Sequence, residues 1–179
     1  MKRIGILSDT HSCWDERFAR HFADCDDIWH AGDIGCVDVI RRLEQVCPMV
    51  RAVHGNIDTG ECRRYFPLIQ QFETEGTSVF MTHVGGYPGR YAPGVTQMLR
   101  DARARLFVSG HSHILKVMYD NQLDCLHINP GAAGHHGWQK TRTLVKLDLN
   151  EGVPSNLEVI ELGKLTADPP RSMPGIRNV

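Results

Sequence analysis

The sequence predicts an α/β domain in which two mixed β-sheets lie face to face between helices. The first third alternates short apolar strands with amphipathic helices, a pattern typical of parallel strands joined by crossover helices. The second half consists mainly of strand segments whose gaps are too short for a helix, so we expect it to be largely antiparallel. With 179 residues, 41% of them hydrophobic, the chain is long enough for one packed core.

The elements of the first third follow from the spacing of the apolar residues. We expect strands over residues 3–8, 27–30 and 49–53, and helices over 14–22 and 37–46. The first helix places Trp14, Phe18 and Phe22 on one stripe, and the second repeats this helical spacing. The resulting β-α-β-α-β order favours three parallel strands.

The remaining elements follow from turn residues and short apolar runs. A hairpin is expected over 68–82, because two strand-like segments flank Glu75 and Gly76. A glycine- and proline-rich loop over 85–94 then precedes a helix over 95–103 and strands over 106–109, 114–119, 123–128, 143–150 and 157–162. We expect residues 1–162 to form a single domain, followed by a proline-rich tail over 163–179 whose composition is typical of disorder.

Composition and charge exclude several classes of protein. The net charge of -1 argues against avid, non-specific nucleic-acid binding, although a nucleotide substrate remains open. No apolar run approaches the roughly 20 residues that span a bilayer, and residues 4–7 are too few for a signal-peptide core. The six cysteines form no C-x-x-C pair. We therefore expect a cytoplasmic protein with reduced thiols and no membrane partner.

Polar side chains follow five of the expected strands at the point where each strand ends. These are Asp9 and His11, Asp33 after Gly32, Asn56 after Gly55, His83, and His111 and His113 after Gly110. In open α/β sheets, sites form outside the carboxyl ends of the strands, so we expect these side chains to converge. The glycines allow backbones to approach closely where ligands meet.

This ligand set indicates metal chemistry. Two carboxylates, one amide oxygen and four imidazoles suit Zn²⁺, Mn²⁺, Fe²⁺ or Ni²⁺, and no thiolate is present to complete a closed structural site. Seven ligands are too many for one ion but suit two ions that share a bridging carboxylate. The ligand set selects no single metal; we expect two divalent ions, Mn²⁺ first, with Ni²⁺, Fe²⁺ or Zn²⁺ as alternatives.

The same residues carry a family resemblance. Asp9-x-His11, Gly32-Asp33, Gly55-Asn56, His83 and Gly110-His111-Ser112-His113 resemble the five signature blocks of calcineurin-like metallophosphoesterases. The resemblance spans residues 1–150 and points to the small prokaryotic phosphodiesterase branch. It implies a four-layer α-β-β-α sandwich, in agreement with the strand pattern. It also implies hydrolysis of phosphodiester bonds by attack of a metal-bridging hydroxide.

The resemblance implies a role for each site residue. Asp9, His11, Asp33 and His113 would hold one metal, and Asp33, Asn56, His83 and His111 the other, with Asp33 as the bridge. Asn56 and His83 would also contact the phosphate and serve catalysis. The expected partner is a small phosphate ester or nucleotide, and small relatives often self-associate, so a homo-oligomer is possible.

Departures from the family pattern leave some roles open. Many relatives follow Gly-Asn with a histidine that assists the leaving group, whereas this chain has Ile57. His54 and Asp58 are candidates for a general acid by proximity alone, and Arg90 is either a phosphate clamp or a solvated side chain. His30 is a candidate to support the site. His135 and His136 are candidates for substrate contact rather than metal coordination.

Two rival functions remain. One is a phosphomonoesterase with the same site. The other is a non-catalytic scaffold similar to the retromer subunit that shares this fold. A complete ligand set favours an enzyme, because scaffolds of this type have degraded metal sites.

Overall fold

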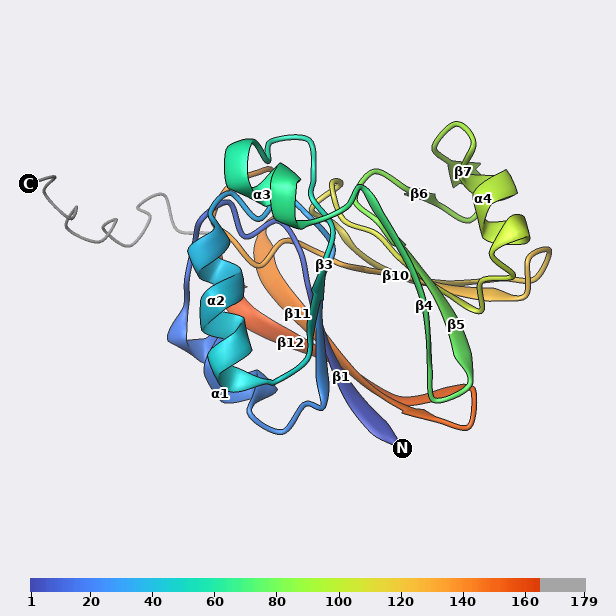
Figure 1. Cartoon of the computed structure of the whole chain (residues 1–179), viewed down its shortest axis with the longest axis horizontal. Helices are drawn as coiled ribbons and strands as arrows, with labels where there is room; N and C mark the ends of the chain where they lie inside the picture. The colour runs from blue at the N-terminus through green and yellow to red at the C-terminus, as the bar shows by residue number, and fades with distance from the viewer. Residues whose placement is uncertain (165–179) are drawn as a thin grey trace, which may run out of the picture.

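The computed structural model describes residues 1–164, which form two five-stranded sheets packed face to face with helices on their outer sides (Figure 1). The elements are β1 (Lys2–Leu7), α1 (Glu16–Phe22), β2 (Asp27–His30), α2 (Val37–Val46), β3 (Val50–Ala52), α3 (Gly60–Tyr65), β4 (Ile69–Thr74), β5 (Thr77–Thr82), β6 (Gly86–Tyr87), β7 (Arg90–Tyr91), α4 (Val95–Asp101), β8 (Leu106–Val108), β9 (Leu115–Asp120), β10 (Cys125–Pro130), β11 (Thr141–Asn150) and β12 (Val153–Lys164). The prediction of an α/β sandwich is confirmed.

The first sheet has the strand order β12-β11-β1-β2-β3. The strands β1, β2 and β3 run parallel, with α1 and α2 as crossovers, which confirms the β-α-β-α-β prediction. β11 pairs antiparallel with both β1 and β12. Helix α1 begins later than expected because the Asp15 side chain caps it, accepting a hydrogen bond from the N–H of Arg17.

The second sheet has the strand order β4-β5-β8-β10-β9. Strands β4 and β5 form the expected hairpin, with Glu75 and Gly76 in the left-handed region at its turn. The expectation of antiparallel pairing is wrong for β8 and β10, which run parallel. The chain leaves β8, enters the β9–β10 hairpin through its outer strand, and returns beside β8 in the same direction.

Three features were not expected from the sequence. Helix α3 spans six residues, too few to show an apolar stripe. The loop over 85–94 contains the two-residue strands β6 and β7, which pair with each other. Strand β12 continues two residues beyond the expected end at residue 162. Most of the expected tail over 163–179 lies outside the described residues.

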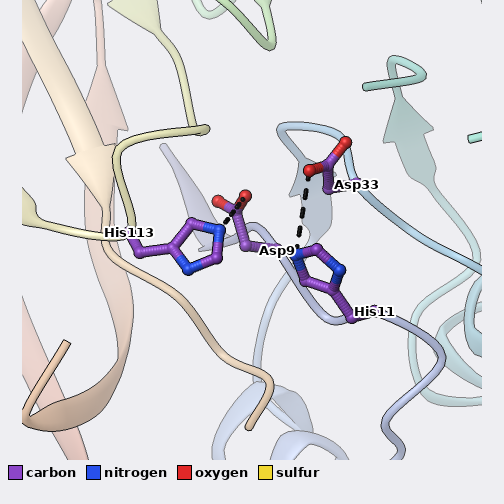
Figure 2. Close-up of side chains that lie close together, drawn as sticks. All are labelled: Asp9, His11, Asp33 and His113. Atoms are coloured by element: carbon purple, nitrogen blue, oxygen red, sulfur yellow. Dashed lines mark ion pairs between the residues drawn. The ribbon is translucent and has the colours of Figure 1, made fainter. Parts of the chain in front are cut away.

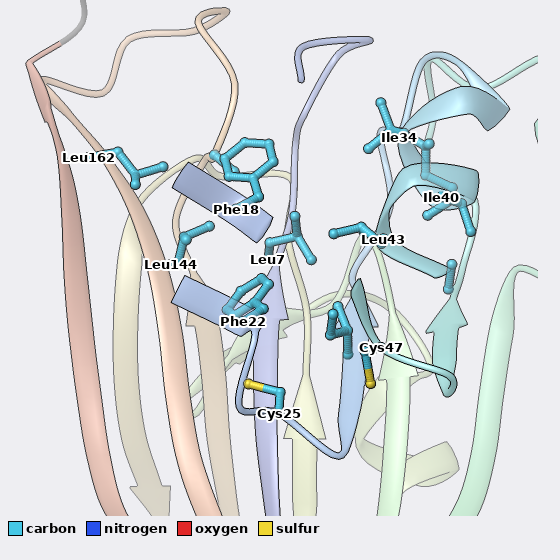
Figure 3. Packing of buried hydrophobic residues seen from close by; sticks show 14 of the residues in the cluster. Leu7, Phe18, Phe22, Cys25, Ile34, Ile40, Leu43, Cys47, Leu144 and Leu162 are labelled. Carbon is cyan, nitrogen blue, oxygen red and sulfur yellow. The ribbon is translucent and has the colours of Figure 1, made fainter. Parts of the chain in front are cut away.

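Apolar side chains fill three layers around the two sheets. Figure 3 shows the layer between the first sheet and helices α1 and α2, where Leu7, Phe18 and Leu43 are completely buried. A second cluster fills the space between the sheets, and a third lies between the second sheet and α4. These layers fix the strands, and therefore the loops at their carboxyl ends.

None of the helices in residues 1–164 has the length and apolar character needed to span a membrane.

Candidate metal centre

Loops from both sheets meet where their strands end. The N–H of Asp9, after β1, donates to the carbonyl of Gly32, after β2, over 2.9 Å. In the second sheet, the N–H of Gly110 donates to the carbonyl of His83 over 3.0 Å. The N–H of His111 then donates to Oδ2 of Asp9 over 3.2 Å, which joins the two sheets. The convergence expected from the sequence therefore occurs.

The structure brings six of the seven expected ligands into two groups that share one carboxylate. Asp9, His11, Asp33 and His113 form the first group, and Asp33, His83 and His111 form the second. Within each group, one ligand atom per residue lies within 4.8 Å of the others. Figure 2 shows the first group, with side chains from separate loops pointing toward one another.

Asn56 lies beside these groups, in the loop after β3. It is exposed, and it stands between Gly55 and Ile57. The N–H of Ile57 donates to Oδ1 of Asp33 over 3.1 Å. The loop that carries Asn56 therefore contacts the shared carboxylate through its backbone.

The imidazoles face the two carboxylates at short distances. Nε2 of His113 lies 3.1 Å from Oδ1 of Asp9, and Nε2 of His83 lies 3.2 Å from Oδ1 of Asp33. Nδ1 of His83 lies 2.8 Å from the carbonyl oxygen of Ala31, and Nδ1 of His113 lies 3.2 Å from Oε1 of Gln139. Because these oxygens only accept, each Nδ1 donates, and each ring turns its Nε2 toward a carboxylate.

A bound cation would satisfy the nitrogen and oxygen atoms that face one another in this site. Oδ1 of Asp9 and Nε2 of both His11 and His83 are buried without a hydrogen-bond partner within residues 1–164. Buried polar atoms without a partner are costly, and facing lone pairs repel each other. A divalent ion accepts electron pairs from both nitrogen and oxygen, so the donor set fits the metals that the family implies.

The charges of the site also shift the pKa values of its histidines and aspartates. Burial lowers the pKa of His83, but the carboxylates of Asp33 and Asp9 beside the ring outweigh burial and raise it. The pKa of His113 is raised chiefly by the close contact of its ring with the carboxylate of Asp9. Burial raises the pKa of Asp33, yet the neighbouring His83 ring brings it below its ordinary value. The carboxylates therefore favour a positive charge at these rings, whether a proton or a metal ion supplies it.

Backbone strain is concentrated in these loops. Asp9, His11, Asp33, His111 and His113 all have positive φ, between 47° and 69°. Residues other than glycine rarely adopt this region, and such strain persists at sites where the surrounding structure fixes it. The strained backbone aims each side chain into the shared centre.

Glycines allow the loops to approach as closely as the sequence predicts. A Cβ at Gly32 would lie 2.6 Å from Nδ1 of His83, and one at Gly110 would lie 2.9 Å from Oδ2 of Asp9. Real Cβ atoms essentially never come within 3.0 Å of a heavy atom from a residue that is not their neighbour in the chain. The expected role of these glycines is confirmed.

Asp58 holds two loops of the site together. It is completely buried, and its carboxylate accepts hydrogen bonds from the N–H groups of Ile34 at 3.1 Å and of Gly35 and Gly55 at 2.7 Å. With both oxygens held by backbone donors, Asp58 is a poor general acid, which corrects the suggestion from its proximity. Its carboxylate therefore connects the loop after β2 to the loop after β3.

His54, the other candidate for a general acid, is partly exposed, and its Nδ1 lies 3.3 Å from the carbonyl oxygen of Gly55.

His30 joins the first two loops, as its place before Gly32 suggested. Its Nδ1 accepts from the N–H of Gly32 over 3.2 Å, so Nε2 carries the hydrogen and faces Oγ1 of Thr10 at 2.9 Å. Complete burial lowers the pKa of His30 to about 4, which keeps the ring neutral. Gln139, which orients His113, had no signal in the sequence.

The remaining candidates differ in their distance from the centre. The ring of His136 lies 5.2 Å from that of His11, so it borders the first group. His135 is partly buried and belongs to neither ligand group. Arg90 is exposed on β7, and its side chain forms no hydrogen bond or ion pair with any other residue in the described part of the chain.

Comparison with known proteins agrees with this site. A model of the calcineurin-like phosphoesterase superfamily domain matches residues 1–152. A probable metallophosphoesterase from Methanothermobacter thermautotrophicus is 34% identical over 143 residues, which are 72% of this chain and 76% of that protein.

Solved structures share the fold at lower identity. An archaeal phosphodiesterase matches with a TM-score of 0.68 and 22% identity, over 89% of this chain and 99% of that one. Wild-type Vps29 from Entamoeba histolytica, complexed with zinc, matches with a TM-score of 0.69 and 13% identity, over 89% and 98% of the two chains. The domain match and the curated relative together show that the chain belongs to the calcineurin-like phosphoesterase superfamily.

Proposed function

We propose that this protein is a two-metal phosphoesterase that hydrolyses phosphodiesters. The observation that carries the proposal is the pair of ligand groups that share Asp33. When bound, two divalent cations supply a hydroxide for attack on phosphorus and neutralise charge on the phosphoryl oxygens. We assign one cation to Asp9, His11, Asp33 and His113, and the other to Asp33, Asn56, His83 and His111. Mn²⁺ is the metal we expect first.

The chain's own residues prepare this site for an anionic substrate. Asp33 is held from one side by the N–H of Ile57, and His83 is oriented by the carbonyl of Ala31. Within residues 1–164, the ligand groups contain two carboxylates, those of Asp9 and Asp33, so a loaded site keeps positive charge for a phosphate. Asn56 and His83 are the residues we expect to contact that phosphate.

A diester with a good leaving group is the substrate class we favour. Ile57 has no proton to donate, and the Asp58 carboxylate is occupied by backbone donors. His54 is then the remaining candidate for a general acid, and we expect esters whose leaving groups need least protonation to react best. The archaeal neighbour is described as a phosphodiesterase, which agrees with this choice.

The scaffold alternative rests on the similarity to Vps29. Fold similarity alone does not assign function. The ligand set of this chain favours an enzyme, because every expected metal position carries a residue able to bind a cation.

The test is hydrolysis of bis-p-nitrophenyl phosphate and p-nitrophenyl phosphate after metal removal and re-addition of Mn²⁺, Ni²⁺, Fe²⁺ or Zn²⁺. We expect metal-dependent cleavage with preference for the diester, lost in Asp33→Asn. Asp38→Asn is the matched control, since Asp38 is exposed on α2, pairs with Arg41 and belongs to neither ligand group. Preference for the monoester would support the phosphomonoesterase. No turnover and no metal bound by the folded protein would support the scaffold.

A further inference from the structure

A pocket of about 120 Å³ opens beside the candidate metal centre, with His111 in its wall. Three glycines form part of its lining. The side chains that line it are Tyr87, His111, Ser112, Lys116, His127 and Asn129. They come from β6, β9 and β10 and from the loop after β8. No carboxylate lines the pocket, although aspartates are frequent at the metal centre next to it.

Lys116 gives the pocket a positive charge. Its ammonium lies 3.4 Å from the centroid of the Tyr87 ring, in a cation–π contact that positions it. Within residues 1–164, Lys116 forms no ion pair with a carboxylate. A positioned ammonium without a counter-ion is a binding group for an anion.

His127 adds a buried hydrogen-bond donor to the pocket. The residue is 1% exposed, its Nε2 lies 3.0 Å from Oγ of Ser109, and its Nδ1 has no partner within the described residues. The buried Ser109 hydroxyl has no other acceptor there, so it donates to Nε2 and the hydrogen of the ring sits on Nδ1. Burial, and then the charge of Lys116, lower the pKa of His127 to about 4, so the ring is neutral at pH 7.

Ser112 offers a third donor. Its Oγ accepts hydrogen bonds from Nδ2 of Asn129 at 3.1 Å and from the N–H of Ile114 at 3.3 Å, which leaves its own hydrogen free. Oδ1 of Asn129 accepts from the N–H of Gly131 over 3.0 Å. Three of the side chains that line the pocket therefore offer a donor: the ammonium of Lys116, the imidazole N–H of His127 and the hydroxyl of Ser112.

We propose that this pocket binds a second phosphate group of the substrate. Three donors with one positive charge and no carboxylate match the three oxygens of a terminal phosphate. This inference rests on the proposed function and narrows its substrate class. The substrate is a phosphodiester with a further phosphate on one ester arm, so that the scissile group lies at the metals while the second phosphate contacts Lys116 and His127.

The experiment compares two substrates that release the same chromophore. One is the p-nitrophenyl ester of thymidine 5′-phosphate, and the other is the same ester with an additional 3′-phosphate. We expect kcat/KM for the bisphosphate to be higher by roughly tenfold or more, mainly through KM, because charge-assisted hydrogen bonds are added. The ratio between the substrates should fall to about one in Lys116→Met and decrease in His127→Leu. It should persist in Lys116→Arg and in the control Lys2→Met.

Titration of the metal-free protein with inorganic phosphate, followed by calorimetry, separates the possible sources of the ligand. We expect binding that Lys116→Met weakens by roughly tenfold. Phosphate binding with equal kcat/KM for the two esters would mean that the pocket takes free phosphate, which would overturn the substrate assignment. No phosphate binding and equal kcat/KM would overturn the pocket itself. Failure of the proposed function would appear separately, as no turnover of bis-p-nitrophenyl phosphate.

Discussion

A side-chain carbon on Gly55 would lie 2.0 Å from Oδ1 of Asp33, the carboxylate shared by both ligand groups. The same carbon would lie 2.4 Å from the backbone nitrogen of Asp33, so rotation of the carboxylate alone would not relieve the contact. At Gly55, the loop after β3 is therefore packed directly against Asp33, the proposed bridge between the two metals.

The substitution Gly55→Ala should displace Asp33 and weaken metal binding. We expect a loss in metal affinity of roughly 10–100-fold, the range seen when the support of a ligand is removed. Gly89→Ala is the control, because a Cβ there meets nothing within 4 Å and only the positive φ of 84° adds strain. Calorimetric titration with Mn²⁺ measures the effect. Wild-type affinity in Gly55→Ala would mean that the loop moves away at little cost.

The substitution Asp58→Asn separates a positioning role from a catalytic one. An amide has one acceptor oxygen in place of two, so at least one backbone N–H loses its partner, at a cost of about 1–3 kcal/mol. We expect lower stability in urea unfolding together with weaker metal binding. A general acid would behave differently: metal binding would stay intact, while the limb of the pH–rate profile at high pH would disappear.

The ligands could be found in the sequence because each stands next to the end of an apolar run. His83 directly follows β5, Asp9 lies two residues after the end of β1, and Asp33 follows a glycine just after β2. The α/β rule for strand ends then brings them together. The supporting contacts have no such local pattern. Gln139 reaches His113 from 26 residues away, and Asp58 binds backbone groups, which any sequence provides.

In the fold as well, local patterns could be predicted from the sequence and long-range pairings could not. Apolar spacing predicted β1, β2, α1 and α2, since each buries its own apolar residues. The parallel pairing of β8 with β10 depends on which strand of the β9–β10 hairpin lies next to β8. Local spacing therefore identifies the hairpin and leaves its orientation undetermined.

The substitution Asp15→Asn should destabilise the fold away from the metal centre. Arg142 is 2% exposed, and its Nη2 lies 3.0 Å from Oδ2 of Asp15, so loss of the carboxylate leaves a buried guanidinium without its counter-ion. The cost of breaking such a pair is about 3–5 kcal/mol. The exposed pair of Asp38 and Arg41 provides the control, because Asp38→Asn should change stability by less than about 1 kcal/mol.

This destabilisation should depend on pH in a defined direction. Hydrogen bonds from Arg17 and then from Arg142 hold the pKa of Asp15 well below its ordinary value of 3.8 in spite of partial burial. A depressed pKa in the folded state gives stability that is full above 3.8 and is lost as the pH falls toward the folded pKa. The difference between wild type and Asp15→Asn in urea unfolding should be constant at neutral pH and shrink below about pH 4. A constant difference at all pH values would contradict an ionic role.

Metal affinity should rise with pH through the titration of two histidines. The raised pKa values of His83 and His113 mean that both rings hold a proton above the ordinary value of 6.5, and that proton must leave before Nε2 can bind a metal. We expect Mn²⁺ affinity to increase as the pH rises above 6.5, with up to two protons released per chain. Calorimetric titration in buffers of different ionisation enthalpy counts these protons.

The substitution His83→Gln should reduce the number of protons released by about one, since the amide carries no proton to displace. His21→Gln is the matched control and should leave the count unchanged, because His21 lies on α1 and belongs to neither ligand group. A count independent of pH would mean that both rings are already neutral in the metal-free protein, and that the carboxylates bind the first ion without displacing protons.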